Sequence, residues 1–253
     1  MAGAESKDLK AVVELLVRAS RVVALTGAGI SVESGIPAFR GAQGLWERYD
    51  PMEYAHIDAF RANPGKVWQM LKELRALIVQ ARPNPAHLAL AEMERLGRLK
   101  AIITQNVDNL HQAAGSSEVI EFHGNGATLI CLDCRRRFAR AEVSLEELPP
   151  RCDCGGVLKP EVVFFGEMIP AKTYDRAVQA ASSCDLMMVI GTSAQVAPAS
   201  QMPWLALRSG AKVVEFNLEP TELTGRAAHY TLLGLASEVL PLVAARLRQA
   251  LQS

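Results

Sequence analysis

Short, nearly continuous apolar runs recur along the chain, with helical stretches between them. Strands that are covered on both faces in a parallel sheet show such unbroken runs, whereas strands with one wet face alternate apolar and polar residues. The pattern therefore predicts buried strands. They lie at residues 22–26, 101–104, 119–122, 186–190 and 212–216, with a weaker strand at 231–235.

The stretches between these runs carry helix signals. Residues 8–19 place apolar side chains at helical spacing. Asn84 followed by Pro85 predicts a helix start, and Gly97 predicts its end near residue 96. Ser237 with Glu238 predicts the start of a last helix that runs to about residue 247. Alternating strands and helices predict an α/β fold with a doubly wound parallel sheet.

Two stretches interrupt the alternation and predict a smaller module beside the sheet. Residues 41–80 have a helical pattern without strands, and residues 124–165 contain four of the five cysteines. We therefore assign residues 1–40, 81–123 and 166–253 to the sheet domain, and residues 41–80 and 124–165 to the smaller one. The uncharged window 186–207 is too polar for a membrane span, and we expect a strand, a turn and a helix start there.

Composition and charge narrow the classes of function. The chain has 27 Lys and Arg against 27 Asp and Glu, and 49% of its residues are hydrophobic. The hydrophobic content excludes disorder as the main state, and the zero net charge argues against a general binder of nucleic acid or anionic membrane. No secretory signal is visible at the N-terminus, so we expect a cytoplasmic protein.

A glycine-rich turn follows the first predicted strand. Gly27, Gly29 and the small residues around them are typical of a turn that brings backbone amides close to a phosphate. Val32 stands where a dinucleotide fingerprint has its third glycine, and no acidic residue follows about 20 positions later. The turn alone is equally compatible with tight strand-to-helix packing. Phe39 and Arg40 just beyond it supply an aromatic wall and a candidate phosphate contact.

Small or polar residues follow five predicted strands. The carboxyl ends of parallel strands lie at one edge of the sheet. The residues that follow these strands therefore predict a single site the size of a dinucleotide. His123 is the candidate base there, and His111 is a candidate supporting residue. We interpret His56, His87 and His229 as structural or surface residues without notable polar neighbours. The strand-end residues are Gly27, Gln105, Asn106, Asp108, His123, Gly191, Thr192, Ser193 and Asn217.

The cysteines form two close pairs, Cys131-x-x-Cys134 and Cys152-x-Cys154. Four thiolates can complete a tetrahedral zinc site and leave no open position, which indicates a structural ion; reduced free thiols are the alternative. We interpret Cys184 as a buried core thiol. The nearby arginines predict a solvated surface run, with a nucleic-acid or acidic-partner contact as the alternative. They are Arg135, Arg136, Arg137 and Arg140.

Together these motifs resemble the sirtuins, the NAD-dependent protein lysine deacylases. The resemblance rests on Gly27-Ala-Gly-Ile-Ser31, Gly35-Ile-Pro-Ala-Phe-Arg-Gly41, Thr104-Gln-Asn-Val-Asp108, Leu110-His111, His123-Gly124, Val162-Val-Phe-Phe-Gly-Glu167, Gly191-Thr-Ser193 and Asn217. It extends from about residue 8 to about residue 245 and is greatest to the compact bacterial and archaeal members. It implies a Rossmann-like large domain, and a small domain made of a zinc module and a helical module.

The resemblance also implies an enzyme that consumes NAD to deacetylate lysine in proteins or peptides. Its products would be nicotinamide, O-acetyl-ADP-ribose and free lysine, with His123 as general base on a ribose hydroxyl. Asn106 and Asp108 would act with it at the nicotinamide end. The other implied NAD-binding residues are Gly27, Ala28, Gly29, Ile30, Ser31, Phe39, Arg40, Gln105, Gly191, Thr192, Ser193, Asn217 and Ala236.

The acetyl-lysine peptide would add as a strand between two segments of the chain. The implied substrate residues are Val163, Phe164, Phe165, Gly166, Glu167 and Val196, and the implied zinc ligands are the four clustered cysteines. Leu71 and Leu74 stand where members that remove succinyl groups have Tyr and Arg, and Arg75 is about 100° away around the helix. We therefore expect acetyl and other neutral acyl groups to be preferred.

Three alternatives to deacetylation follow from the same residues. Other neutral acyl groups would use the same site, and mono-ADP-ribosyl transfer would use the same NAD pocket. A zinc-dependent nucleic-acid or chromatin-binding module is disfavoured by the neutral charge. An ordinary NAD dehydrogenase is excluded by the incomplete glycine motif and the missing acidic residue.

Overall fold

The structure is a computed structural model that describes residues 7–40 and 44–252. Its larger part is a six-stranded sheet with the strand order β3-β2-β1-β7-β8-β9, in which every neighbouring pair is parallel. The strands are β1 (Val22–Thr26), β2 (Leu99–Thr104), β3 (Val119–Glu121), β7 (Leu186–Ile190), β8 (Lys212–Asn217) and β9 (Tyr230–Leu233). All six predicted strands are therefore present, in one parallel sheet.

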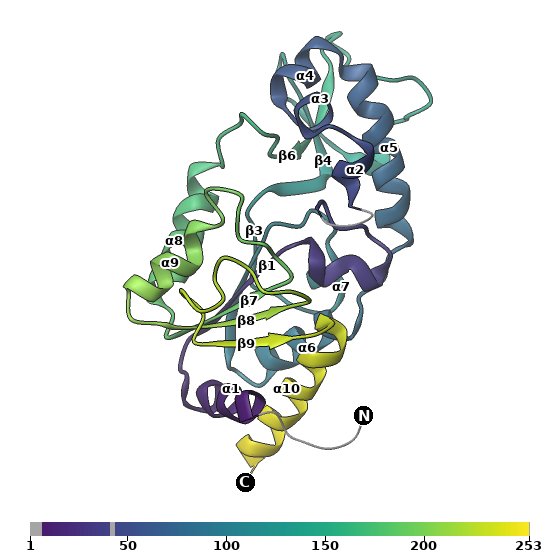
Figure 1. The fold of residues 1–253 in the computed structure, drawn as a ribbon. Coiled ribbons are helices and arrows are strands. Elements are labelled where there is room, and N and C mark those ends of the chain that lie inside the picture. The colour runs from purple at the N-terminus through teal and green to yellow at the C-terminus, as the bar shows by residue number, and fades with distance from the viewer. Residues whose placement is uncertain (1–6, 41–43, 253) are drawn as a thin grey trace.

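Helices cover both faces of this sheet, as Figure 1 shows. On one face lie α1 (Lys7–Arg18), α6 (Pro85–Arg95) and α10 (Ala236–Gln252), whose apolar side chains share a buried cluster with β1, β2, β7 and β8. On the other face lie α8 (Ala171–Ser183) and α9 (Gln201–Arg208), which form a second cluster with the same strands. The predicted doubly wound α/β fold is confirmed.

The ends of the elements differ from prediction by a few residues. Strand β2 begins two residues earlier than expected, at Leu99, because Leu99 pairs with Val22. Helix α10 begins at Ala236 and continues to Gln252, past the expected end at residue 247. The window 186–207 contains a strand, a turn and the start of α9, as predicted. Among the described residues, no helix has the length and apolarity needed to cross a bilayer.

The smaller part lies at one end of the sheet domain (Figure 1). It contains an antiparallel sheet in the order β5-β4-β6 and a group of helices, and its apolar core includes Phe60, Trp68, Leu129 and Leu158. The strands are β4 (Gly124–Cys131), β5 (Arg137–Ala139) and β6 (Leu158–Val162). The helices are α2 (Leu45–Arg48), α3 (Pro51–Tyr54), α4 (Ile57–Ala62), α5 (Pro64–Gln80) and the short 3₁₀ helix η2 (Arg140–Glu142).

Local sequence explains how this part begins and how it joins the large sheet. The Asn63 side chain accepts a hydrogen bond from Lys66 N and Pro64 occupies the first turn, which together start α5. Strand β4 begins directly after His123, and Val163, directly after β6, donates through its backbone to the His123 carbonyl. The chain therefore enters the small sheet through β4 and leaves it through β6 at the same place, beside His123. The exact domain boundaries stay a prediction.

Candidate active site

A cleft of about 1010 Å³ lies between the carboxyl edge of the large sheet and the small part. Small or polar residues at the carboxyl ends of five strands contribute to its lining, including Gln105, His123 and Asn217, so the predicted shared edge exists. Ile30, Ser31, Asp108 and Ala236 do not line it. The other predicted residues that line it are Gly27, Ala28, Gly29, Phe39, Arg40, Asn106, Val163, Phe164, Phe165, Gly166, Glu167, Gly191, Thr192, Ser193 and Val196.

The glycine turn packs directly against the turn after β7. Gly29 N donates to Gly191 O at 2.8 Å, and a Cβ on Gly29 would lie 2.7 Å from Gly191 Cα. Only glycine permits this approach. The chain then enters the 3₁₀ helix η1 (Ala28–Ser34), in which Val32 takes the place of a third glycine. Tight packing is therefore confirmed and places residues 27–29 at the cleft, whereas the contact with a phosphate stays a prediction.

Beneath the turn lies a buried polar cluster that fixes Asn106. Ser31 Oγ donates to Asp108 Oδ2 at 2.7 Å, and Asn106 Nδ2 donates to Ser31 Oγ and Gly27 O, each at 3.1 Å. Asn106 Oδ1 is buried without a protein partner in the described part of the chain, although the residue lines the cleft. An orphaned acceptor at a cleft favours a ligand that donates a hydrogen bond there.

His87 belongs to this cluster, and our expectation that it lacks polar neighbours was wrong. Its Nδ1 accepts from Asn84 N at 3.3 Å, and its Nε2 lies 3.5 Å from Ser31 Oγ. The His111 ring is 5.0 Å away, centroid to centroid, and His111 Nε2 lies 2.9 Å from Thr26 Oγ1. The capping bond is local, since His87 lies three residues after the N-cap Asn84, whereas the contact with Ser31 requires distant segments to meet.

Burial lowers the pKa of His87 to about 4, although Asp108 opposes this shift. Burial, with repulsion from His87, lowers the pKa of His111 to about 3. Both rings are therefore neutral in the folded protein, whereas the unfolded chain takes up protons below pH 6.5. We expect the free energy of unfolding to fall as the pH drops from about 6.5 towards 4, by up to roughly 1.4 kcal/mol per pH unit for each ring.

Urea denaturation at several pH values measures this slope. The His111→Gln variant should be less stable at pH 7 but show a shallower loss on acidification. His56→Gln, outside the cluster, is the matched control and should keep the wild-type slope. An unchanged slope in His111→Gln would contradict the assignment.

His123 is positioned by the backbone of the neighbouring strand end. Its Nδ1 lies 3.1 Å from Gln105 O, and a carbonyl can only accept, so Nδ1 carries the proton and Nε2 is left unprotonated. Burial lowers the pKa of His123, while the bond to Gln105 O opposes the shift. Gln105 Nε2 in turn donates to Thr192 Oγ1 at 3.0 Å. The cleft therefore contains a neutral imidazole poised to accept a proton.

The predicted substrate segment, residues 163–167, is held by a residue that sequence analysis missed. Lys159 is only 4% exposed, and its Nζ pairs with Glu167 Oε2 at 2.8 Å and donates to Val162 O at 2.7 Å. Glu167 Oε2 also accepts from Phe164 N at 2.9 Å. Gly166 has φ +81°, and a Cβ there would lie 2.7 Å from His56 Nε2. The segment is thus a fixed edge of the cleft.

A second missed residue supports the far side of the cleft. Glu215 is fully buried in β8 and accepts hydrogen bonds from Thr221, Thr224 and Thr231. Thr221 and the preceding residues 217–220 line the cleft. The sequence contained a signal for this support, because Glu215 interrupts an apolar run that was predicted to be a buried strand. A buried carboxylate requires hydrogen-bond donors nearby.

The four clustered cysteines converge despite the short second pair. All four Sγ atoms lie within 4.8 Å of one another, with Cys131 and Cys154 at 3.5 Å and Cys134 and Cys152 at 3.7 Å. A tetrahedral zinc with Zn–S bonds of about 2.3 Å needs S···S separations of roughly 3.8 Å. Gly156 makes the turn fit, since a Cβ there would lie 2.6 Å from Cys131 Sγ. The donor set fits one structural zinc. Cys184 is buried, as expected.

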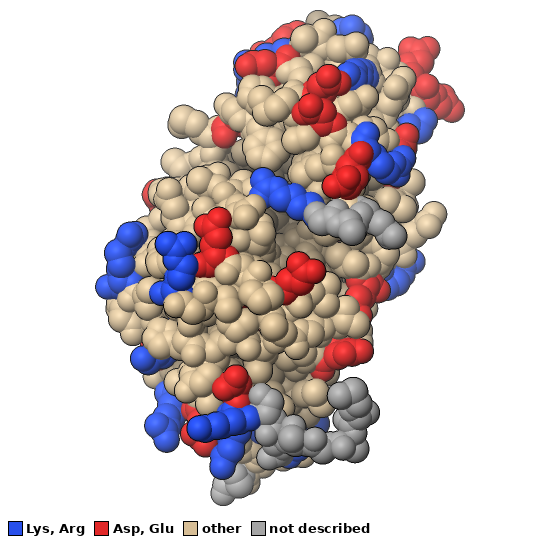
Figure 2. Space-filling model, viewed as in Figure 1, with Lys and Arg blue, Asp and Glu red and all other residues tan. Residues whose placement is uncertain are grey.

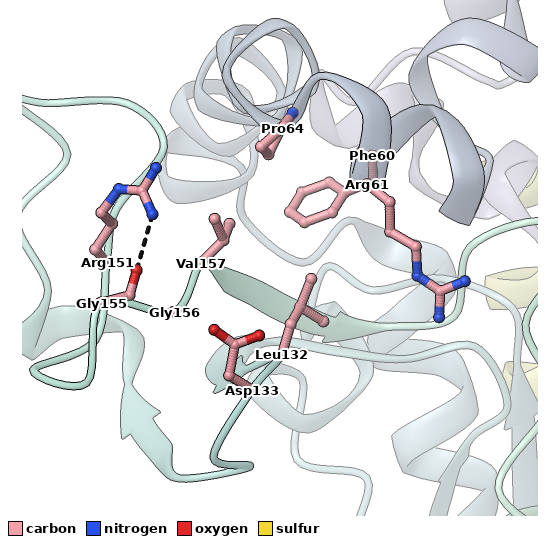
Figure 3. A pocket seen from close by; sticks show the side chains of 9 residues that line it. All are labelled: Phe60, Arg61, Pro64, Leu132, Asp133, Arg151, Gly155, Gly156 and Val157. Atoms are coloured by element: carbon pink, nitrogen blue, oxygen red, sulfur yellow. Dashed lines mark hydrogen bonds between the residues drawn. The ribbon is translucent and has the colours of Figure 1, made fainter.

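A smaller hollow of about 160 Å³ lies beside these loops (Figure 3). Arg151 Nη1 donates to Gly155 O there at 2.8 Å, while Phe60, Leu132 and Val157 form an apolar part of the lining. None of the residues predicted for NAD, substrate or metal lines it. The cleft, rather than this hollow, therefore contains the candidate chemistry.

The arginine run is only partly on the surface. Arg136 pairs with Asp153 and Arg137 with Glu161, each at 2.9 Å and largely exposed, as expected for solvated side chains. Arg140 contradicts the expectation: it is 8% exposed, and it lines the cleft. The reason is that η2 follows the short strand β5, which turns the chain back over the small sheet.

Comparison with known proteins assigns the architecture to a family. The family model described as "Sir2 family" matches residues 27–198, more than half of the chain. The chain belongs to the Sir2 family. Among curated Sir2 relatives, "NAD-dependent protein deacetylase 1" of Pyrobaculum aerophilum is 48% identical over 244 residues, which cover 95% of each chain.

Solved structures of the Sir2 family agree with this assignment. A crystal structure of a Sir2 homolog–NAD complex has a TM-score of 0.90 at 42% identity and covers 99% of this chain and 97% of its own. A Sir2–p53 peptide–NAD⁺ complex has a TM-score of 0.85 at 35% identity and covers 97% of this chain and 99% of its own. The Rossmann-like large domain expected from the sequence is thereby confirmed.

Proposed function

We propose that this Sir2-family chain is an NAD-dependent protein lysine deacetylase. It would release nicotinamide and transfer the acetyl group of acetyl-lysine to ADP-ribose, leaving free lysine. The observation that carries the proposal is the unprotonated Nε2 of His123 in a cleft lined by both the glycine turn and residues 163–167. The relatives named deacetylases support it.

The predicted residues of the cleft and of the buried polar cluster beneath it have roles consistent with their positions. NAD, when bound, supplies the ribose carbon to which the acyl oxygen is transferred. His123 takes a proton from a ribose hydroxyl, and a neutral imidazole near physiological pH suits that task. Asn106 presents its free Oδ1 to the nicotinamide end, while buried Ser31 and Asp108 position it. Gly27, Ala28 and Gly29 bring the backbone close to the phosphates, and Arg40 adds charge.

The peptide substrate would lie along residues 163–167, whose backbone is held by Lys159 and Glu167. Backbone pairing gives affinity with little demand on the peptide sequence. Leu71 and Leu74 line the cleft, as expected, and favour acetyl and other neutral acyl groups over succinyl. Arg75 also lines the cleft, although its helical angle predicted that it would point elsewhere.

Direct binding of nucleic acid is not part of the proposal. Figure 2 shows basic and acidic side chains interspersed on the face in view, without a broad basic patch. Cysteines retained as thiolates around zinc fit the cytoplasm, which we propose as the compartment.

Mass spectrometry of an acetyl-lysine peptide, incubated with the zinc-loaded protein with and without NAD, tests the activity. We expect loss of the acetyl group only with NAD, matched by nicotinamide and O-acetyl-ADP-ribose. Labelled ADP-ribose trapped on protein would instead indicate mono-ADP-ribosyl transfer. Turnover without NAD, or none with it for any neutral acyl group, would contradict the proposal.

A further inference from the structure

The small-domain end of the cleft contains a buried cation, Arg140, that has no counter-ion among the described residues. Arg140 is 8% exposed and lines the cleft, and its Nη1 donates a hydrogen bond to Val143 O at 2.8 Å. Within the described residues, no carboxylate lies within ion-pair distance of Arg140 or of Arg75, which lines the same cleft. The remaining guanidinium donors of Arg140 are therefore available to a ligand.

Burying the guanidinium of Arg140 without a counter-ion is unfavourable in free energy. Removing a charge from water is unfavourable unless it is paired, and Arg75 adds repulsion. Burial and this neighbour both lower the pKa of Arg140. Around the two arginines the cleft wall is mainly apolar, with Leu71, Leu74 and Leu129 among its residues. A chain with an apolar stem and an anionic end is complementary to this arrangement.

Strand β4 connects this end of the cleft to His123. The strand begins at Gly124, directly after His123, and its Thr128 pairs with Ala139, the residue before Arg140. Five residues of strand span on the order of 15 Å. Gly126 and Ala127 lie between and line the cleft, and a Cβ on Gly126 would meet nothing within 4 Å. The cleft is therefore open beside Gly126, midway along the strand between the two ends.

We propose that Arg140, with Arg75, binds the terminal carboxylate of a long dicarboxylic acyl group on lysine. This inference rests on the proposed deacylase function and adds a substrate class to the same cleft. The acyl stem would lie along Gly126 and Ala127. Acetyl groups are too short to reach Arg140. Succinyl groups would end nearer Leu71 and Leu74, so we still expect succinyl-lysine to be a poorer substrate than acetyl-lysine.

The test compares two lysine peptides of equal acyl length, decanoyl and decanedioyl, which differ only in the terminal carboxylate. Binding is measured by calorimetry without NAD, and kcat/KM is measured with NAD. In the wild-type chain we expect decanedioyl to bind more tightly than decanoyl, by roughly 10- to 100-fold for a charge-assisted bond. The advantage should appear mainly in KM.

Three variants separate charge from structure. Arg140→Gln keeps a donor for Val143 O but removes the charge, and should bring the decanedioyl-to-decanoyl ratio close to one. Arg140→Lys should retain a preference above one. Arg136→Gln, an exposed arginine of the same run, should keep the wild-type ratio. Thermal unfolding of each variant establishes that it is folded.

The outcomes distinguish this inference from the function on which it rests. A wild-type ratio near or below one, or a ratio that Arg140→Gln leaves unchanged, would overturn the inference. If no peptide is turned over with NAD, the deacylase proposal fails, yet the calorimetric ratio still decides whether the carboxylate site exists.

Discussion

Replacing His123 with alanine is expected to lower kcat/KM for an acetyl-lysine peptide by about 10²- to 10⁴-fold, the range for loss of a general base. No other histidine lines the cleft among the described residues, so nothing replaces the imidazole. The fall should appear in kcat rather than in peptide binding, because the ring acts on a ribose hydroxyl. Steady-state kinetics with detection of nicotinamide measures both.

Two controls make the His123 result specific. His229→Gln changes a histidine on the far end of the sheet, where its Nδ1 accepts from Val213 N, and should retain wild-type kinetics. Thermal unfolding should show that His123→Ala remains folded. A variant with alanine at position 123 that kept more than a tenth of the activity would exclude His123 as the base.

Removing zinc is expected to abolish activity although no cysteine lines the cleft. The cysteine loops close the small sheet, and β4 and β6 extend from them to His123 and Val163. Four thiolates without a metal would be left close together, and metal binding contributes directly to folding free energy. We expect the Cys134→Ala chain to contain less than about a tenth of the wild-type zinc and to unfold at a clearly lower temperature.

The matched control for zinc loss is Cys184→Ala. Cys184 is buried in the sheet domain, outside the cluster, and burial raises the pKa of its thiol to about 11. This variant should retain one zinc per chain and its activity. Zinc content by elemental analysis decides the comparison. Equal zinc content in the Cys134→Ala chain would show that the cysteines do not form the site.

Local patterns in the sequence determined much of the architecture. Unbroken apolar runs located the six parallel strands, since burial on both faces requires apolar residues at successive positions. Asn84-Pro85 located the start of α6 because both residues act within one helical turn. The short spacing within each cysteine pair predicted the cluster. Residues so close in sequence are already neighbours, so only the two pairs had to come together in the fold. Topology then placed the strand-end residues on one edge.

The tertiary structure alone decided features that depend on distant segments. The neutral pair His87 and His111 is buried because α6 and α7 (Leu110–Ala113) pack together. Lys159 is a support for the substrate segment because the chain turns back to place Glu167 beside it. Arg140 and its neighbours in the run have similar sequence surroundings, yet only Arg140 is enclosed at the cleft. Burial and charge pairing depend on the folded surroundings, which the local sequence around a residue does not contain.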